Sequence, residues 1–301
     1  MIWVIILGLV IIGLWPFLSQ VFTPLKQFLV QLCTQKDTST SSQAHQQRLE
    51  TWYKPQAQDY DSSRSKFLRG RQTMISLCAS VLPRPRIWID LGGGTGNNLE
   101  FMAKIMDLNS FTAIHLVDLS PSLAQKAQEK VDRNGWTNVH IHVMDASSFE
   151  CPDKVDLVTM SYSLTMMESY FDTLDKIHNQ WLSPTGILGI ADFFTAPNRS
   201  DDITRHQSLL MRTFWRLWFS LDNVYLDPDR RAYLDYKFKP LIQLNCSHLY
   251  IPPFIRVPYY VFVGAAKESA LQPLDVNAFP KICKRNTHEE EDETFSIAGD
   301  E

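Results

Sequence analysis

The chain has 301 residues, 45% of them hydrophobic, which is long enough to bury the core of a full domain. Its formal charge of −4 comes from an acidic end, because seven acidic residues and no Lys or Arg follow Arg285; without them 29 basic residues face 33 − 7 = 26 acidic ones, a balance of +3. This weak charge excludes the basic field of a nucleic-acid-binding protein. The five cysteines are scattered without a C-x-x-C pair, so we expect neither a disulfide framework nor a bound metal.

The first 25 residues carry no charged side chain, and residues 2–18 (IWVIILGLVIIGLWPFL) are almost wholly apolar. About 20 such residues can cross a ~30 Å hydrocarbon layer. A cleaved signal peptide would begin with Lys or Arg and end at a small-residue site, and neither is present. We therefore expect a transmembrane anchor over 1–25. A buried hydrophobic hairpin divided at Pro16 is the alternative, because Pro16 and Pro24 would each kink a helix.

Lys26 and Lys36 follow this apolar run and no basic residue precedes it, which favours a cytosolic location for the rest of the chain. Polar residues without an apolar period predict a linker over 26–50. We expect a single-pass protein of a membrane, the endoplasmic reticulum being the expected one. A globular domain would cover 51–267, and an acidic, disordered tail would cover 268–301.

Residues 87–98 (IWIDLGGGTGNN) form an apolar run that ends on Asp90 and enters a glycine-rich loop. Such a run is typical of a buried parallel strand, and glycines after it let the backbone approach a ligand. A second apolar run ends on Asp118, where a carboxylate can accept both hydroxyls of a ribose. The G-x-G-x-x-G fingerprint of dinucleotide-binding proteins fails in every frame. The pattern D-x-G-x-G-x-G fits instead, as in class I methyltransferases that bind S-adenosylmethionine (AdoMet); a purely structural turn is the alternative.

Further apolar runs at 139–147, 154–164 and 186–194 alternate with helix-like segments at 122–135 and 169–182. This alternation predicts a doubly wound, mostly parallel α/β sheet of the Rossmann-like methyltransferase class, with its ligand at the carboxyl ends of the strands. Asp145 ends the third run, where an acid would face the adenine amino group. The predicted cofactor-binding residues are Asp90, Gly92, Gly94, Gly96, Asp118, Leu119, Asp145, Ala146 and Ser161.

Residues 205–223 predict an amphipathic helix, with Leu210, Phe214 and Leu217 at helical spacing and arginines along another side. The helix could simply pack on the sheet, or it could form an apolar wall for acyl chains with arginines facing an anionic headgroup. Residues 248–267 form the expected final strands, although three prolines interrupt them.

Several less general strings resemble the methyltransferase part of betaine lipid synthase over residues 50–265. They are WYKPQAQDYDSSRSKFLRGR, DLGGGTGNN, LVDLSPSL, NGWTNV, SYSLTMM and IPPFIRVPYY. The resemblance implies an AdoMet-dependent enzyme that trimethylates the amine of diacylglyceryl-homoserine, giving diacylglyceryl-trimethylhomoserine. Asn97 and Thr185 depart from the family's expected aromatic residue and glycine. The family's second domain has no room in the given sequence; if the chain is complete, we expect a separate aminocarboxypropyl transferase to supply the homoserine lipid.

Methyl transfer to nitrogen is an in-line displacement that mainly requires alignment of a neutral amine with the methyl group. The candidates for proton acceptance or amine orientation are Tyr162, Tyr60 and Asp192, whereas a structural role is expected for His178. The candidates for the substrate carboxylate are Arg64, Arg216 and Arg256. Two other functions stay open: methylation of a quinone or another small membrane-soluble molecule, and a catalytically idle AdoMet-binding partner of a separate transferase.

Overall fold

The computed structural model describes residues 47, 50, 68–82, 86–196, 207–220, 224–251 and 255–275. The predicted anchor over 1–25, almost all of the predicted linker, and the candidates Tyr60 and Arg64 lie outside these residues. No helix among the described residues is both long and apolar enough to cross a bilayer.

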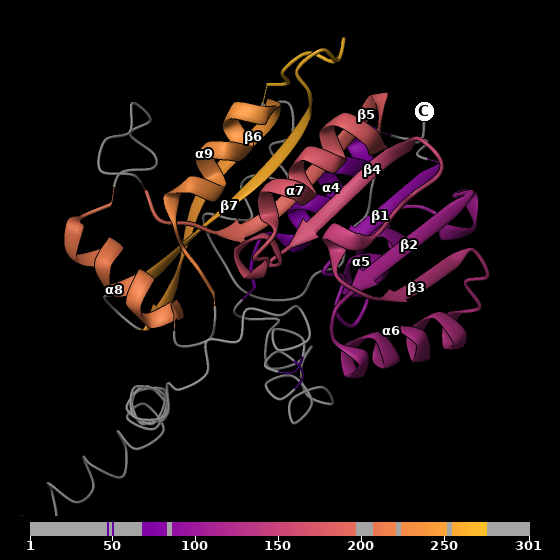
Figure 1. Ribbon diagram of the computed structural model, residues 1–301, viewed down its shortest axis with the longest axis horizontal. Helices are drawn as coiled ribbons and strands as arrows, with labels where there is room; N and C mark the ends of the chain where they lie inside the picture. The colour runs from indigo at the N-terminus through magenta and orange to yellow at the C-terminus, as the bar shows by residue number, and fades with distance from the viewer. Residues whose placement is uncertain are drawn as a thin grey trace, which may run out of the picture.

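A seven-stranded sheet in the order β3-β2-β1-β4-β5-β7-β6 forms the centre of the molecule (Figure 1). The strands are β1 (Ile87–Leu91), β2 (Ala113–Asp118), β3 (Val139–Val143), β4 (Val155–Ser161), β5 (Leu182–Phe193), β6 (Phe238–Ile251) and β7 (Ile255–Ala266). The first five are parallel, and β7 runs antiparallel between β5 and β6. The prediction of a Rossmann-like, mostly parallel α/β sheet is therefore confirmed.

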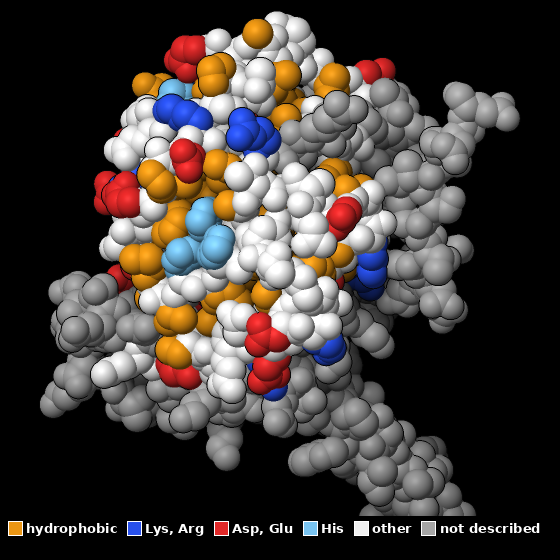
Figure 2. Space-filling view, turned by 90° about the vertical axis from the view of Figure 1, so that its right-hand side faces the viewer, with side chains coloured by type: hydrophobic (Ala, Val, Ile, Leu, Met, Phe, Trp, Pro, Cys, Tyr) orange, Lys and Arg blue, Asp and Glu red, His pale blue; other side chains and the backbone are white. Residues whose placement is uncertain are grey.

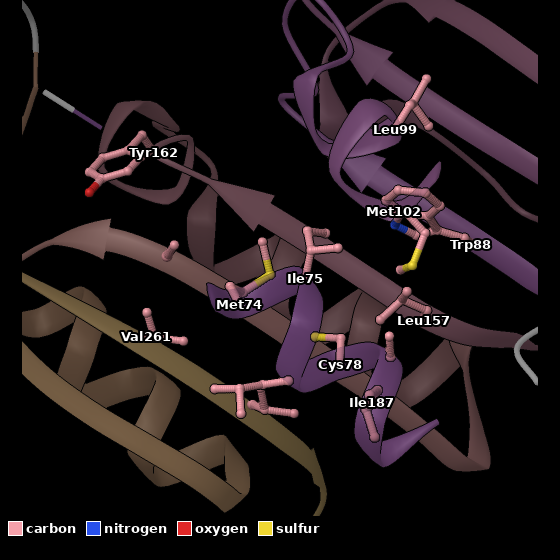
Figure 3. Close-up of a cluster of buried hydrophobic side chains, with 14 of the residues drawn as sticks. Met74, Ile75, Cys78, Trp88, Leu99, Met102, Leu157, Tyr162, Ile187 and Val261 are labelled. Atoms are coloured by element: carbon pink, nitrogen blue, oxygen red, sulfur yellow. The ribbon is translucent and has the colours of Figure 1, made fainter. Parts of the chain in front are cut away.

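Helices cover both faces of this sheet and produce two hydrophobic cores. One core receives side chains from α4 (Arg71–Val81), α5 (Asn97–Ala103), α6 (Pro121–Asn134) and α8 (Leu209–Ser220). The other receives them from α7 (Tyr170–Lys176), the π-helix η5 (Ile177–Trp181) and α9 (Pro228–Lys237). Figure 3 shows how Met74, Ile75 and Cys78 of α4 pack against the strands in the first core.

The boundaries of α6 follow from its sequence. The Ser120 hydroxyl accepts a hydrogen bond from the Leu123 N–H, Pro121 stands at the first helical position, and Gly135 ends the helix with φ 66°. Leu123, Ala127 and Val131 are buried on one side, as the apolar spacing predicts. The predicted helix over 122–135 thus differs from the observed one by a single residue at each end.

The connection between β3 and β4 carries only a short 3₁₀ turn, η3 (Ala146–Ser148), in place of a full crossover helix. His115 of β2 and His140 and His142 of β3 therefore gather at the β2–β3 end of the second face, which no described helix covers. Figure 2 shows histidine side chains together on this side of the molecule, bordered by hydrophobic ones.

The prolines of the last strands lie where the sheet tolerates them. Pro258 lies one residue beyond Tyr259, the last β7 residue paired with β5, so β5 needs no N–H from it. Pro240 lies on the edge strand β6 beside an irregularity in the pairing. The fold also extends past the predicted boundary at 267, because the Ser269 hydroxyl donates to the Pro184 carbonyl and the Leu274 N–H to the Leu241 carbonyl.

Candidate active site

The loop after β1 turns through three glycines with left-handed backbone: Gly92 at φ 66°, Gly94 at φ 56° and Gly96 at φ 79°. A side chain at Gly92 would also collide with Ser163, whose Cβ would lie 2.3 Å away. At Gly94 the nearest atom to an added Cβ lies at 4.0 Å, on Leu123. The backbone at Gly94 therefore faces open space that a ligand can approach, which is the use of glycine that the sequence predicted.

Asp118 ends β2 opposite this loop, and two backbone N–H groups hold its carboxylate. Gly94 donates to Oδ2 and Ser120 to Oδ1, each at 2.8 Å. Burial raises the pKa of Asp118, while the bonds from Ser120 and Gly94 oppose the rise. Glu50 lies close by, because its carboxylate accepts the hydroxyls of Ser120 and Ser122 at 2.7 Å each.

These elements border a pocket with about 720 Å³ of space, counting its open mouth, at the carboxyl ends of the parallel strands. Of the predicted cofactor-binding residues, seven line it: Gly92, Gly94, Asp118, Leu119, Asp145, Ala146 and Ser161. Asp145 is fixed by the Ser147 N–H and hydroxyl, both of which donate to Oδ1, at 2.8 and 2.6 Å. The sheet thus brings residues from four strand ends to one pocket, as the doubly wound topology requires.

Asp90 and Gly96 do not line the pocket. Asp90 is fully buried beneath the loop, and its Oδ1 accepts hydrogen bonds from Asn98 Nδ2 at 2.8 Å and Thr159 Oγ1 at 2.6 Å. Burial raises its pKa to about 6. These contacts tie β1, α5 and β4 together, so Asp90 supports the loop from below and its predicted direct contact with cofactor is not seen.

Tyr162 lines the pocket directly after β4 with φ 54°, and among described residues it is the only non-glycine with left-handed backbone. Its hydroxyl does not serve the pocket, because it donates to the Arg69 carbonyl at 2.5 Å. The ring lies in the hydrophobic core 4.5 Å from that of Phe193, and burial raises the Tyr162 pKa well above its ordinary value (Figure 3). The strained backbone brings Ser163 beneath Gly92, so Tyr162 shapes the pocket and is poorly placed to act as a base.

Asp192 is fully buried and does not line the pocket, which corrects its prediction as a catalytic candidate. Its carboxylate accepts the Thr165 N–H at 3.0 Å and hydroxyl at 2.8 Å. Arg230 supports the same turn, η4 (Leu164–Met166), by donating to the carbonyls of Leu164 and Met167, each at 3.2 Å. Asp192 and Arg230 are thus positioning residues that hold the pocket wall in place.

Comparisons with known proteins agree with this geometry. Residues 89–186 match the family described as "Methyltransferase domain". The protein is an AdoMet-dependent methyltransferase. No curated protein matches the sequence.

The methyltransferase is also similar in fold to solved structures. A 1,6-didemethyltoxoflavin-N1-methyltransferase from Burkholderia thailandensis aligns with a TM-score of 0.52 at 15% identity, over 77% of this chain and 92% of its own. The N-methyltransferase NodS from Bradyrhizobium japonicum aligns with a TM-score of 0.49 at 13% identity, over 66% of this chain and 87% of its own.

The two predicted substrate arginines that the structure describes lie elsewhere on the methyltransferase. Arg216 of α8 pairs with Asp227 at 2.8 Å, and Arg256 of β7 donates to the Ser247 hydroxyl and carbonyl at 3.0 Å each. Neither lines the pocket. Their partners lie on β6 and on the segment that follows α8, and their contact with the substrate carboxylate stays a prediction.

The two departures from the family's pattern have no contact with the pocket. Asn97 accepts a hydrogen bond from Lys130 Nζ at 2.6 Å and so joins α5 to α6. Thr185 is exposed near the start of β5, away from the strand ends that bind the cofactor. Neither substitution therefore changes the cofactor site directly.

The sequence did not identify the pocket wall formed by η4 and α7. Six of the pocket's lining residues lie in or near these elements: Ser163, Met166, Met167, Glu168, Ser169 and Thr173. Met144, from the loop after β3, also lines the pocket. The string SYSLTMM marked the place only through the resemblance, since a methionine or serine has no spacing pattern that distinguishes a pocket wall from a core. The methionines among them make part of the pocket apolar and polarizable.

The charge of the pocket fits AdoMet. Asp118, Asp145 and Glu168 line it, and no Lys, Arg or His is among its described lining residues. An anionic wall favours the sulfonium cation, and Asp118 is placed to accept ribose hydroxyls. When bound, AdoMet supplies the electrophilic methyl group, and the residues of the chain orient it and exclude water.

Proposed function

We propose that this methyltransferase acts on nitrogen and trimethylates the amine of diacylglyceryl-homoserine to form the betaine lipid diacylglyceryl-trimethylhomoserine. The resemblance of residues 50–265 to betaine lipid synthase suggests this acceptor. The proposal includes anchoring by residues 1–25 in a membrane, expected to be the endoplasmic reticulum, with the domain in the cytosol. It also includes a separate aminocarboxypropyl transferase that supplies the acceptor.

The observation that carries an amine acceptor is the acidic pocket. Both the protonated amine before reaction and the quaternary ammonium after the third transfer are cations, as is the sulfonium. The pocket has three carboxylates and no basic residue among its described lining residues, so its negative potential attracts all three cations. A phenol or enol acceptor would have to lose its proton and carry negative charge on its oxygen before transfer, which this wall would oppose.

The chemistry needs little beyond alignment. The amine lone pair forms the new N–C bond as the S–C bond breaks, leaving S-adenosylhomocysteine and a protonated, methylated amine that loses a proton before the next transfer. An α-amino group has a reference pKa near 8, so about a tenth is neutral at pH 7 without a base. Glu168, which was not among the candidates from the sequence, is the described carboxylate on the η4 side of the pocket, where it can orient this amine.

The test incubates the protein in membranes with methyl-labelled AdoMet and diacylglyceryl-homoserine. We expect mono-, di- and trimethylated lipid in succession, and no product from a Gly94→Asp variant, whose side chain would enter the pocket. Absence of all three products with the unaltered protein would disprove the acceptor. Label in a quinone or another small membrane-soluble molecule instead would select that alternative.

A further inference from the structure

Helix α8 presents an apolar face that the rest of the described structure leaves open. Trp215 and Phe219 are 1% and 3% exposed and fix the helix to the first core. On other sides Leu209, Leu210 and Leu217 are 70%, 73% and 60% exposed. Figure 1 shows α8 at the margin of the molecule, beyond the sheet. Large exposed leucines grouped on one helix mark an interaction surface.

The side chains around this face have the composition of a helix that lies in a membrane interface. At 100° per residue Leu210 and Leu217 fall on one stripe, and Phe214 and Trp218 continue it, with ring centroids 5.7 Å apart. The helix sequence LLMRTFWRLWFS contains two arginines and no acidic residue. Exposed leucines and a tryptophan on a helix that carries basic and no acidic residues are the pattern of interfacial helices.

We propose that this face of α8, formed by Leu209, Leu210 and Leu217 and bordered by the partly buried Phe214 and Trp218, inserts into the interface of a phospholipid bilayer. The occupant is a bilayer because residues 1–25 of the same chain form an uncharged apolar run that can hold the domain at a membrane surface. The inference rests on the membrane location in the proposed function, and it adds a second contact that orients the domain.

Helix α8 lies near the pocket, so contact between α8 and a bilayer would bring the pocket close to the membrane. Phe219 of α8 lies 4.6 Å from Phe193, measured between ring centroids, and Phe193 lies 4.5 Å from Tyr162, which lines the pocket. After α8, the Tyr225 N–H donates to the Thr165 carbonyl of η4 at 2.9 Å. The helix is thus fastened to the carboxyl edge of the sheet, so a bilayer against α8 lies at the edge where the pocket opens.

The test uses the full chain reconstituted in phosphatidylcholine vesicles that contain a phosphatidylcholine with a photoreactive group on its acyl chain. After illumination, mass spectrometry locates the lipid adducts. We expect adducts in the peptide that spans 209–220. A Leu210→Glu/Leu217→Glu variant should lose these adducts by about tenfold or more, because each substitution replaces an apolar side chain that would lie in the bilayer by a charged one. The matched control is Tyr236→Glu, which changes a 69% exposed residue of α9 and is expected to keep the α8 adducts.

The outcomes separate this inference from the proposed function. Adducts in residues 1–25 report on the anchor, adducts in 209–220 report on α8, and methylated lipid reports on the acceptor. Absence of adducts in 209–220, as when a second copy or another protein covers α8, would overturn the inference whatever the other two readouts show. Adducts that persist in the double variant would overturn it as well. AdoMet binding by calorimetry shows that each variant is folded, since none of the three positions lines the pocket.

Discussion

Gly94 and Gly135 share a left-handed backbone and open space around the missing side chain, but only Gly94 faces the cofactor pocket. We expect Gly94→Ala and Gly135→Ala each to lower the free energy of unfolding by about 1 kcal/mol, because a Cβ is disfavoured at positive φ. Only Gly94→Ala should also weaken AdoMet binding, by about tenfold or more. Calorimetric titration and denaturant unfolding of both variants test this. Equal AdoMet affinity in the two would contradict the placement of the loop.

A Tyr162→Phe variant distinguishes a positioning role of this residue from a role as catalytic base. Tyr162→Phe removes the bond to the Arg69 carbonyl and leaves the ring in the core, so we expect a loss of about 1 kcal/mol of stability. The pH dependence of kcat should not change, because the hydroxyl does not point into the pocket. If the variant lost most of its kcat and the basic limb of its pH profile moved, Tyr162 would be the base after all.

Glu168 is the residue that we expect to act on the acceptor. Glu168→Gln keeps the size of the side chain and removes its charge, so kcat/KM for the amine should fall by about three- to tenfold while the AdoMet dissociation constant changes less. The matched control is Glu129→Gln on the exposed side of α6, which forms an ion pair with Lys126 at 2.8 Å. A comparable loss in the control, or an effect confined to AdoMet binding, would refute this role.

At the scale of elements, the histidines on the uncovered side of β2 and β3 make the stability of the fold depend on pH. Burial first, and then the charges of His142 and His140, lower the pKa of His115 to about 4 from its usual 6.5. Between these values the unfolded chain binds more protons, so this contribution to stability is complete above pH 6.5 and declines as the pH falls toward 4. The buried Asp90 and Asp192, with pKa values of about 6, act in the opposite direction.

The measurement therefore compares the pH dependence of stability in the unaltered protein and in a His115→Phe variant. The contributions of the buried acids are the same in both proteins and cancel in the difference. We expect the unaltered protein to lose about 1–2 kcal/mol more than His115→Phe when the pH is lowered from 7.5 to 5, after allowance for solvent at this partly exposed site. Parallel pH curves for the two proteins would show that His115 keeps its ordinary pKa when folded.

The same elements show how far sequence reasoning reaches. The parallel strands and the acids at their ends were predictable, because apolar runs that stop at a carboxylate have a distinctive spacing. Helix α9 was not predicted, since its 10 residues include two buried arginines, and the start of β6 was hidden by Pro240. The burial of Asp192 and the pairing of Arg216 with Asp227 could not be predicted, because chemical type does not tell which way a side chain points. That information arises only when distant elements pack together.

At the scale of the whole molecule, AdoMet should act as part of the fold, because its pocket joins the ends of β1, β2, β3 and β4. A ligand at 100 times its dissociation constant stabilises the native state by about 2.7 kcal/mol. In a domain of this size that raises Tm by about 5–10 °C. Asp118→Asn should lose most of this shift, since it removes the charge placed for the ribose. Asp156→Asn is the matched control: this acid accepts the N–H groups of Arg86 and Ile87 at 2.8 and 3.3 Å, away from the pocket, and its variant should keep the shift at a lower starting Tm. Differential scanning calorimetry measures the AdoMet-induced shift in Tm. An equal shift in both variants would show that the ribose site lies elsewhere.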